Sequence, residues 1–168
     1  SIDTYKASVA QKAIQSGASL VNDVWGFTKD PKMASIVSDL KVPVVLMHNQ
    51  GHTVYGDMVN DIINRLEELK TNAMNSGVLE ANIILDPGIG FGKNVVQNIE
   101  LFRSLEMLQK LNSPILIGSS RKSTIGKVLD LPPDQRVEGT AATVVISIIK
   151  GADIVRVHDV KEMMRVVK

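Results

Sequence analysis

Apolar strand-like segments and helical patterns alternate along the whole chain, and this alternation restricts its possible folds more than any other feature. Each strand-like segment is apolar on both faces, which is typical of a parallel sheet covered by helices. Ile2-Asp3 resembles the end of a further strand whose beginning is missing. The sequence therefore predicts an α/β fold, either an open doubly wound sheet or a β/α barrel. The other segments expected to form strands are 19–25, 42–48, 82–86, 114–119 and 152–158.

The segments between the expected strands have apolar residues at helical spacing. Asp30-Pro31 predicts a helix start, because a carboxylate can cap a helix and proline suits its first position. Gly17, Gly77 and Gly151 are expected to end helices just before a strand. Without a linker or low-complexity segment, residues 1–168 are expected to form one domain. Two apolar helix faces are indicated, by Met58, Ile62, Leu66 and Leu69 and by Leu101, Leu105 and Leu108.

The run 83–93 predicts a binding site. An apolar strand ends there on Asp86, and Pro87 and three glycines follow. Charge at the end of a buried strand costs folding free energy unless it is paired, and ligands bind at this end of the strands in barrels and open sheets. A capped turn would explain the same run without a ligand. The G-x-G-x-G spacing does not match the dinucleotide-binding fingerprint.

Polar residues end the other expected strands as well. One such residue usually caps a helix, but their presence on every strand indicates one polar ligand site. Arg156 and His158 lie two apart, so we expect both to point into the same cavity. The polar residues at the strand ends are Asp3, Asn22, Asp23, His48, Asp86, Ser119, Ser120, Arg121, Lys122, Arg156, His158 and Asp159.

These side chains favour a particular ligand chemistry. Carboxylates and an Asn amide can pair with the N–H groups of an amidine-like heterocycle edge. Lys122, Arg156, His158 and a helix starting after Arg121 suit phosphate or carboxylate groups. A nitrogenous ring carrying phosphate is therefore the expected ligand, with a second anion as an option. No cysteine is present and no serine has an evident adjacent histidine, which argues against an acyl-enzyme.

Four further features of the sequence bear on the class of function. A net charge of +1 and an aromatic content of 4% give no basic or stacking surface for nucleic acid. No apolar run reaches the roughly 18 residues that a membrane span requires. The absence of cysteine excludes disulfides and fits a cytosolic enzyme. His48 and His52 lie four apart and could suggest a metal, but the residues between them indicate a loop.

Six segments resemble, in order and approximate spacing, those of dihydropteroate synthase. The most discriminating are Ser-Arg-Lys-Ser at 120–123 and Arg-Val-His-Asp at 156–159; the others are 1–6, 21–24, 45–48 and 85–93. The family has a (β/α)8 TIM barrel, and such a barrel needs eight strands and typically about 250 residues. The resemblance therefore implies that the first two strands and most of the third are missing, and that 1–168 is a partial pterin-binding domain.

Dihydropteroate synthase condenses hydroxymethyl-dihydropterin pyrophosphate with para-aminobenzoate, using Mg²⁺, and releases pyrophosphate in folate biosynthesis. The resemblance implies a likewise cytoplasmic transferase with these small-molecule substrates, and the apolar stretch 144–149 permits a homodimer. The magnesium ligand is expected in the missing part, so no metal ligand is assigned. By position, the pterin would be held by Asp3, Asn22, Asp86 and Lys122, with Met47, Val24, Leu116 and Gly118 packing against it. Arg156 and His158 would take the pyrophosphate, and the Arg156 guanidinium would also lie against the pterin face. Para-aminobenzoate would be received by Phe91, Lys122 and Ser123.

Lys122, Arg156 and His158 are the residues that the resemblance places in catalysis. Two other functions stay open on the sequence. The first is a pterin-dependent methyltransferase, from which the Ser-Arg-Lys-Ser run points away. The second is a noncatalytic pterin-binding module, because the early strands are expected to be missing.

Overall fold

The computed structural model describes all residues from Ser1 to Lys168 and contains each of the six expected strands, in shorter form than the apolar segments. Helices follow the strands in alternation, as predicted. The strands are β1 (Ile2–Asp3), β2 (Val21–Asp23), β3 (Val44–Met47), β4 (Ile83–Asp86), β5 (Leu116–Ile117) and β6 (Ile154–Val155). The α-helices are α1 (Ala7–Gln15), α2 (Met33–Leu40), α3 (Met58–Asn75), α4 (Val95–Arg103), α5 (Ser123–Leu129), α6 (Val137–Ile149) and α7 (Val160–Val166). Three 3₁₀ helices add η1 (Glu80–Asn82), η2 (Leu105–Leu111) and η3 (Pro133–Gln135).

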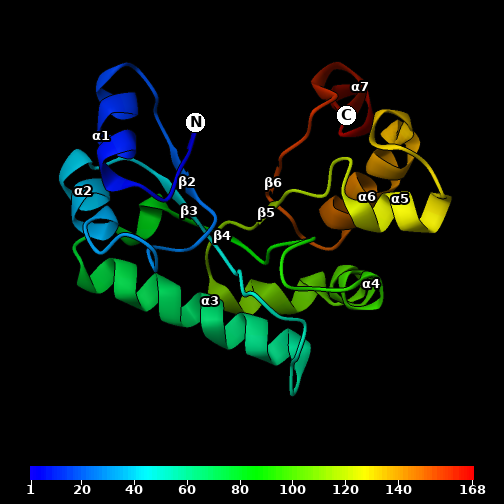
Figure 1. Ribbon diagram of the computed structural model, residues 1–168, viewed down its shortest axis with the longest axis horizontal. Coiled ribbons are helices and arrows are strands. Elements are labelled where there is room, and N and C mark those ends of the chain that lie inside the picture. Colours follow the sequence, from blue (N-terminus) through cyan, green and yellow to red (C-terminus); the bar gives the residue numbers. More distant parts are fainter.

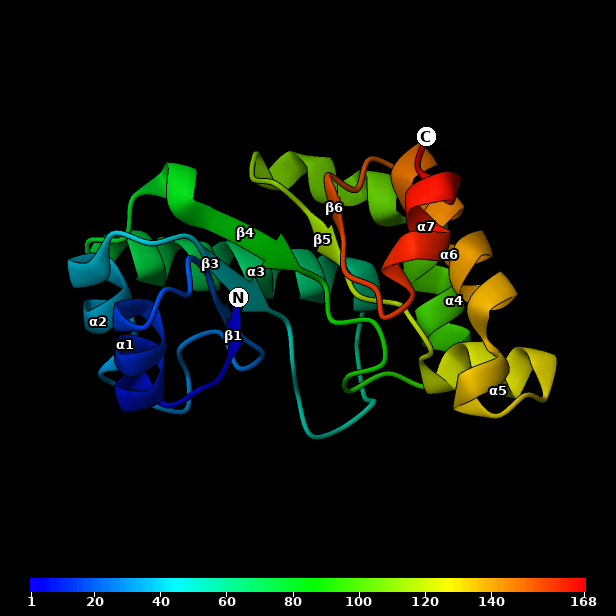
Figure 2. The same ribbon diagram turned by 90° about the horizontal axis from the view of Figure 1, so that it is seen from above.

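All strand pairs are parallel and follow one another in chain order. β1 to β4 form one sheet and β5 pairs with β6. A bridge between Leu85 and Ile115 and a 2.9 Å bond from the Leu85 N–H to the Pro114 carbonyl connect the two. Figure 1 shows the helices as an arc around this row of strands, which Figure 2 shows from above. The arrangement confirms an α/β fold of the barrel type rather than a doubly wound sheet, with six strands where a closed barrel has eight.

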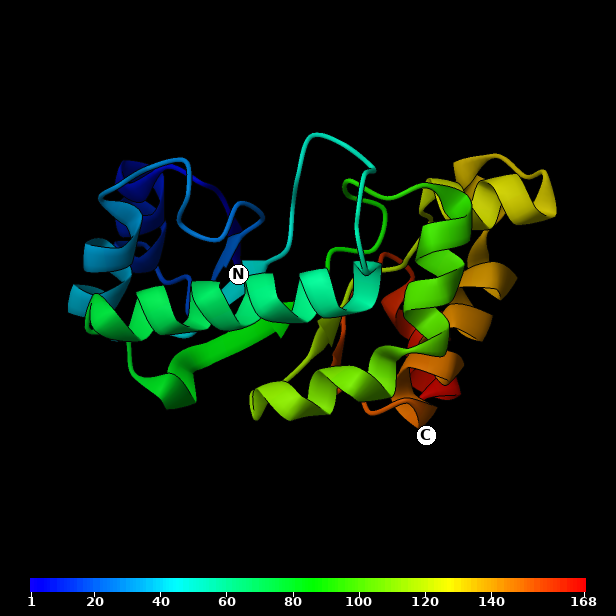
Figure 3. The same cartoon turned by 90° about the horizontal axis from the view of Figure 1, so that it is seen from below.

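The core lies between the strands and the helices around them. Residues 44–47 of β3 are completely buried, and 25 buried apolar residues form one cluster. The long helix α3 crosses beneath the strands (Figure 3) and buries the predicted face that contains Ile62 and Leu66. Asp57 caps this helix by accepting a hydrogen bond from the Asn60 N–H. No helix of the protein has both the length and the apolarity needed to cross a membrane.

Two local predictions need correction. Helix α2 begins at Met33 rather than directly after Asp30. The Asp30 carboxylate accepts hydrogen bonds from the N–H groups of Ala7 at Oδ2 (2.8 Å) and of Lys32 at Oδ1 (3.0 Å), so it connects the start of α1 to the turn before α2. The second leucine face is buried as expected, but α4 ends at Arg103, and Leu105 and Leu108 belong to η2.

The predicted helix-ending glycines are confirmed. Gly17, Gly77 and Gly151 follow α1, α3 and α6 with φ angles of +105°, +92° and +92°. This left-handed conformation favours glycine and turns the chain from each helix toward the next strand. The repeated turn is what brings the carboxyl ends of successive parallel strands to one side of the molecule.

Candidate functional site

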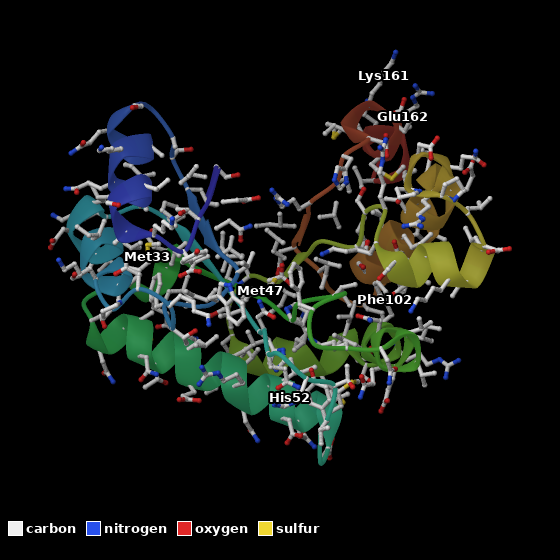
Figure 4. All side chains as sticks on the ribbon, viewed as in Figure 1. Met33, Met47, His52, Phe102, Lys161 and Glu162 are labelled. Carbon is white, nitrogen blue, oxygen red and sulfur yellow. The ribbon has the colours of Figure 1, made fainter.

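A pocket of about 150 Å³ lies at the carboxyl ends of the strands. It brings together polar residues from the strand ends. The strand-end residues that do not line it form contacts within the fold instead. Met47, one of its lining residues, is labelled in Figure 4 in the middle of the arc. The lining residues are Asp3, Asn22, Val24, Met47, Asp86, Ile89, Phe91, Gly118, Ser120, Lys122, Arg156 and His158. Every residue predicted to contact substrate is among them, apart from Ser123 and Leu116.

Asp3 lies between two partners from different parts of the chain. It accepts a 2.9 Å hydrogen bond from Asn22 Nδ2 and forms a 2.6 Å ion pair with Arg156. The ion pair joins β1 to the residue after β6, the two edge strands of the row. Its side chains are about half exposed, at 50% for Asp3 and 52% for Arg156. An exposed pair contributes only about 0–1 kcal/mol, so a ligand can exchange for it at small cost.

Two acceptor atoms in the pocket have no partner in the protein. Asn22 Oδ1 is buried and accepts no hydrogen bond. The Asp86 carboxylate accepts one bond at Oδ1, from the Gly88 N–H at 2.7 Å, and this leaves Oδ2 free. Burial raises the pKa of Asp86 to about 6, although the Gly88 N–H and the nearby cations Lys122, Lys93 and Arg156 oppose this rise. A buried acceptor without a partner is costly, so both atoms suit a ligand with N–H groups.

Lys122 supplies donors opposite these acceptors. Its ammonium lies 4.0 Å from the centroid of the Phe91 ring, within range of a cation–π contact, and forms no hydrogen bond to the protein. Burial lowers the pKa of Lys122, the Asp86 charge opposes that shift, and Arg156 adds to it. The arrangement leaves three N–H donors available to a ligand next to an aromatic ring.

Ser120, one of the polar strand-end residues expected at the site, lines the pocket, although the sequence assigned it no role of its own. Its hydroxyl lies 2.9 Å from His158 Nδ1 and accepts a 3.2 Å bond from the His158 backbone N–H. The expectation that no serine has an adjacent histidine is therefore wrong. Because Ser120 is only 4% exposed and its oxygen already holds the His158 backbone, it serves to orient the imidazole rather than to attack a substrate. A hydroxyl can donate or accept, so it can pair with Nδ1 in either tautomer of the ring.

The two most discriminating sequence motifs, 120–123 and 156–159, contact each other through the Ser120–His158 pair and through a second pair. Arg121, with φ at +56°, forms an ion pair with Asp159. The loop before α5 is thereby fastened to the segment before α7. Gly118, Ser120 and Lys122 line the pocket from this loop.

Some expected site residues lie elsewhere. Ser123 is exposed at the first position of α5, and Leu116 is buried in the sheet, so neither lines the pocket. Asp23 is fully buried and accepts hydrogen bonds from the N–H groups of Trp25 and Phe27, both at 2.9 Å. Its role is to shape the loop after β2. Ile89, which the sequence did not single out, adds an apolar wall to the pocket.

Neither histidine of the 48/52 pair forms part of a metal site. His48 is 3% exposed and its Nδ1 lies 3.1 Å from Lys93 Nζ, whereas His52 is exposed in the following loop (Figure 4). Nowhere in the chain do three or more acidic, histidine or cysteine side chains gather closely enough to hold a metal ion. The residues present do not by themselves fit the Mg²⁺ that the resemblance implies.

Comparison with known proteins agrees with this geometry. Residues 1–158 match the model of the family described as pterin binding enzyme. The whole chain is 52% identical to the dihydropteroate synthase of Bacillus subtilis and covers 59% of it. A Clostridium difficile dihydropteroate synthase crystallised with pteroic acid superposes on 98% of the chain with a TM-score of 0.96 at 50% identity, and 63% of that chain is covered.

The Xanthomonas albilineans dihydropteroate synthase in complex with 7,8-dihydropteroate matches 98% of the chain with a TM-score of 0.94 at 37% identity, and 64% of that chain is covered. The chain thus spans about three fifths of the length of these relatives. With the family model matched over nearly its full length and the pocket at the strand ends, this chain belongs to the pterin-binding enzyme family.

Proposed function

We propose that this chain provides the pterin- and pyrophosphate-binding part of a dihydropteroate synthase. The observation that carries the proposal is the pair of unpartnered acceptors, Asn22 Oδ1 and Asp86 Oδ2, opposite the unpaired ammonium of Lys122. The amidine edge of a pterin offers adjacent N–H donors, and its carbonyl and ring nitrogen offer acceptors. Asp86 and Asn22 would accept hydrogen bonds from the N–H donors, and Lys122 would donate to the carbonyl and the ring nitrogen.

The pyrophosphate would bind to Arg156 and His158 at the open side of the pocket. The Arg156 guanidinium would leave Asp3 and donate to the phosphate oxygens, because a charge-assisted bond to phosphate is stronger than an exposed ion pair. Asp3, still held by Asn22, would then face the pterin. Cations at this position stabilise the negative charge that develops as pyrophosphate leaves the pterin methylene.

The reaction would be mainly dissociative. The electron-rich pterin stabilises the methylene cation, and the amine of para-aminobenzoate then attacks it. Phe91 and Lys122 would flank the second ring, with Ser123 expected near its carboxylate. Mg²⁺ is usually bound by one or two carboxylates together with substrate phosphates, so we propose that it arrives with the pyrophosphate rather than on a cage of these residues. A cytoplasmic location is part of the same proposal.

Arg156→Ala is expected to weaken binding of hydroxymethyl-dihydropterin pyrophosphate by roughly 10- to 100-fold, the worth of one or two bonds to a charged group. Binding of the pterin without pyrophosphate should change clearly less, because it would lose only the contact of this guanidinium with the pterin face and no charged hydrogen bond. Calorimetric titration with both ligands measures the two effects. Arg165→Ala, an exposed arginine on α7 outside the pocket, is the matched control. Equal losses for both ligands would contradict the role in binding the leaving group.

We also propose that the protein forms a homodimer through α4, α5 and α6. These helices line an apolar groove of about 400 Å³, and α6 leaves Val145, Ile146 and Ile149 exposed around it. Exposed apolar patches of this kind commonly mark protein contacts. Ile146→Asp is expected to halve the mass measured by sedimentation equilibrium, whereas Val54→Asp, on an exposed loop residue, should leave it unchanged. A monomeric wild-type protein would overturn the proposal.

A further inference from the structure

Lys93 closes the glycine loop after β4, yet the proposed function gives it no task. Its side chain is buried at 8% exposure, and its ammonium donates to the carbonyls of Gly88 and Phe91, both at 3.0 Å, and to His48 Nδ1 at 3.1 Å. A buried charge normally has a carboxylate partner, but Lys93 forms no ion pair. All three N–H groups are instead used on neutral acceptors, two of which belong to the loop itself.

The loop is held from both sides. While Lys93 binds its carbonyls from within, Asn98 Oδ1 accepts a 2.7 Å bond from the Gly90 N–H, and Tyr55 donates a 2.8 Å bond to the Gly92 carbonyl. Gly88 also donates its N–H to Asp86. One peptide segment therefore connects the ammonium to the Asp86 carboxylate at the end of β4 and to Ile89 and Phe91, the pocket residues that this loop carries.

The contact with His48 fixes the state of the imidazole. An ammonium has no lone pair, so His48 Nδ1 must accept and the ring proton must lie on Nε2. Burial, with the Lys93 charge second, lowers the pKa of His48 to about 4, which keeps the ring neutral. Burial also lowers the pKa of Lys93 to about 8, opposed by the Asp86 charge and helped by that of Lys122.

We propose that Lys93 is a positioning residue whose ammonium holds residues 88–92 in the conformation that presents Phe91 to the pocket and the Gly88 N–H to Asp86. The inference rests on the proposed function, because that function places Phe91 beside the ring of para-aminobenzoate. Its effect on ligands follows from this placement. A ligand that reaches Phe91 depends on the loop more than a ligand confined to the pterin pocket.

The protein contains a matched control for a buried lysine. Lys70 on α3 is 6% exposed and donates to the Leu111 carbonyl at 2.9 Å, and it also pairs with Glu80 at 2.8 Å. It lies outside the pocket-lining residues. Lys70→Met and Lys93→Met each remove one buried ammonium and keep a long apolar side chain, but only Lys93→Met frees the glycine loop.

The test is calorimetric titration of the wild type, Lys93→Met and Lys70→Met with pteroic acid and with hydroxymethyl-dihydropterin. Lys93→Met is expected to lose roughly 10- to 100-fold in pteroic acid affinity and clearly less for the bare pterin. Lys70→Met should bind both ligands within about threefold of the wild type. The ¹⁵N signal of His48 Nδ1 should shift in Lys93→Met alone, because that nitrogen loses its donor.

Every other outcome would overturn either the positioning role or the proposed function. Equal losses for both ligands, or unchanged affinity in a folded Lys93→Met, would overturn the positioning role. If neither Lys93→Met nor the polar variant Lys93→Gln folds while Lys70→Met does, the lysine is needed for the fold itself and the proposal fails. A folded wild type that binds neither ligand would overturn the proposed function instead, so the two failures are distinguishable.

Discussion

Asp86→Asn is expected to make the protein more stable at pH 7 while abolishing pterin binding. Asp86 is 7% exposed, and burial raises its pKa from 3.8 to about 6. Each pKa unit corresponds to about 1.4 kcal/mol, so the ionised carboxylate destabilises the folded state by roughly 2–3 kcal/mol at neutral pH. An amide has no such charge, and its oxygen can still accept the bond from the Gly88 N–H. The free energy of unfolding should therefore rise by about 2 kcal/mol.

The sign of this effect depends on pH. Because the folded-state pKa is raised, the wild type has its full stability below the unfolded value of 3.8 and loses it as pH rises through about 6. The stability gain of Asp86→Asn should thus be present at pH 7 and vanish at pH 3.5. Urea unfolding at the two pH values measures it. Asp39→Asn, on an exposed residue of α2, is the control. A variant less stable than the wild type at pH 7 would contradict the burial argument.

Binding should change in the opposite direction. The amidine N–H groups of a pterin need an acceptor, and the Asn amide presents an uncharged oxygen or an opposing N–H in its place. We expect an affinity loss of roughly 100-fold or more. In the wild type the affinity should also fall as pH drops through about 6, where Asp86 becomes protonated. Asp86→Asn should not show that step.

The second large effect concerns two glycines, Gly88 in the loop after β4 and Gly118 in the pocket wall. Substitution of the first should lower stability, and substitution of the second should weaken binding. A Cβ on Gly88 would lie 2.0 Å from the His48 carbonyl oxygen, and its φ of +73° is unfavourable for other residues. Gly88→Ala should therefore lower the free energy of unfolding by about 4 kcal/mol or more, the upper range for single substitutions. A Cβ on Gly118 would meet no atom within 4 Å, because it points into the open pocket.

Gly118→Ala should accordingly keep its stability within about 1 kcal/mol and lose pterin affinity, since the methyl group occupies ligand space. Thermal unfolding and calorimetric titration of both variants separate the two effects. If Gly118→Ala bound pterin as well as the wild type, Gly118 would not form part of the binding wall. A stable Gly88→Ala would show that the loop has more room beside His48 than its geometry indicates.

The sequence predicted the strands and most of the pocket because both depend on local patterns. Apolar residues on both faces mark a buried parallel strand, and a polar residue at its end is visible without coordinates. For the same reason Arg156 and His158, two apart, were correctly predicted to share a cavity. Because the strands are parallel, their polar ends lie on the same side of the molecule and form one site.

The features that the sequence did not predict depend on contacts between distant segments. The Asp3–Arg156 pair joins residues 153 positions apart, and Ser120 meets His158 over 38 positions. Asp30 precedes α2 by a turn rather than starting it directly, and its bond from the Ala7 N–H spans 23 residues. A sequence pattern shows which groups a segment offers, but the packing of the elements decides which of them become partners.

The central claim is that the pocket at the strand ends binds a pterin. Calorimetric titration of this chain with hydroxymethyl-dihydropterin pyrophosphate tests it most directly, with Asp86→Asn measured alongside and circular dichroism to verify that both proteins are folded. We predict saturable binding at one site per chain, which Asp86→Asn abolishes. Absence of binding by the folded wild type, or equal binding by the folded Asp86→Asn, would contradict the claim.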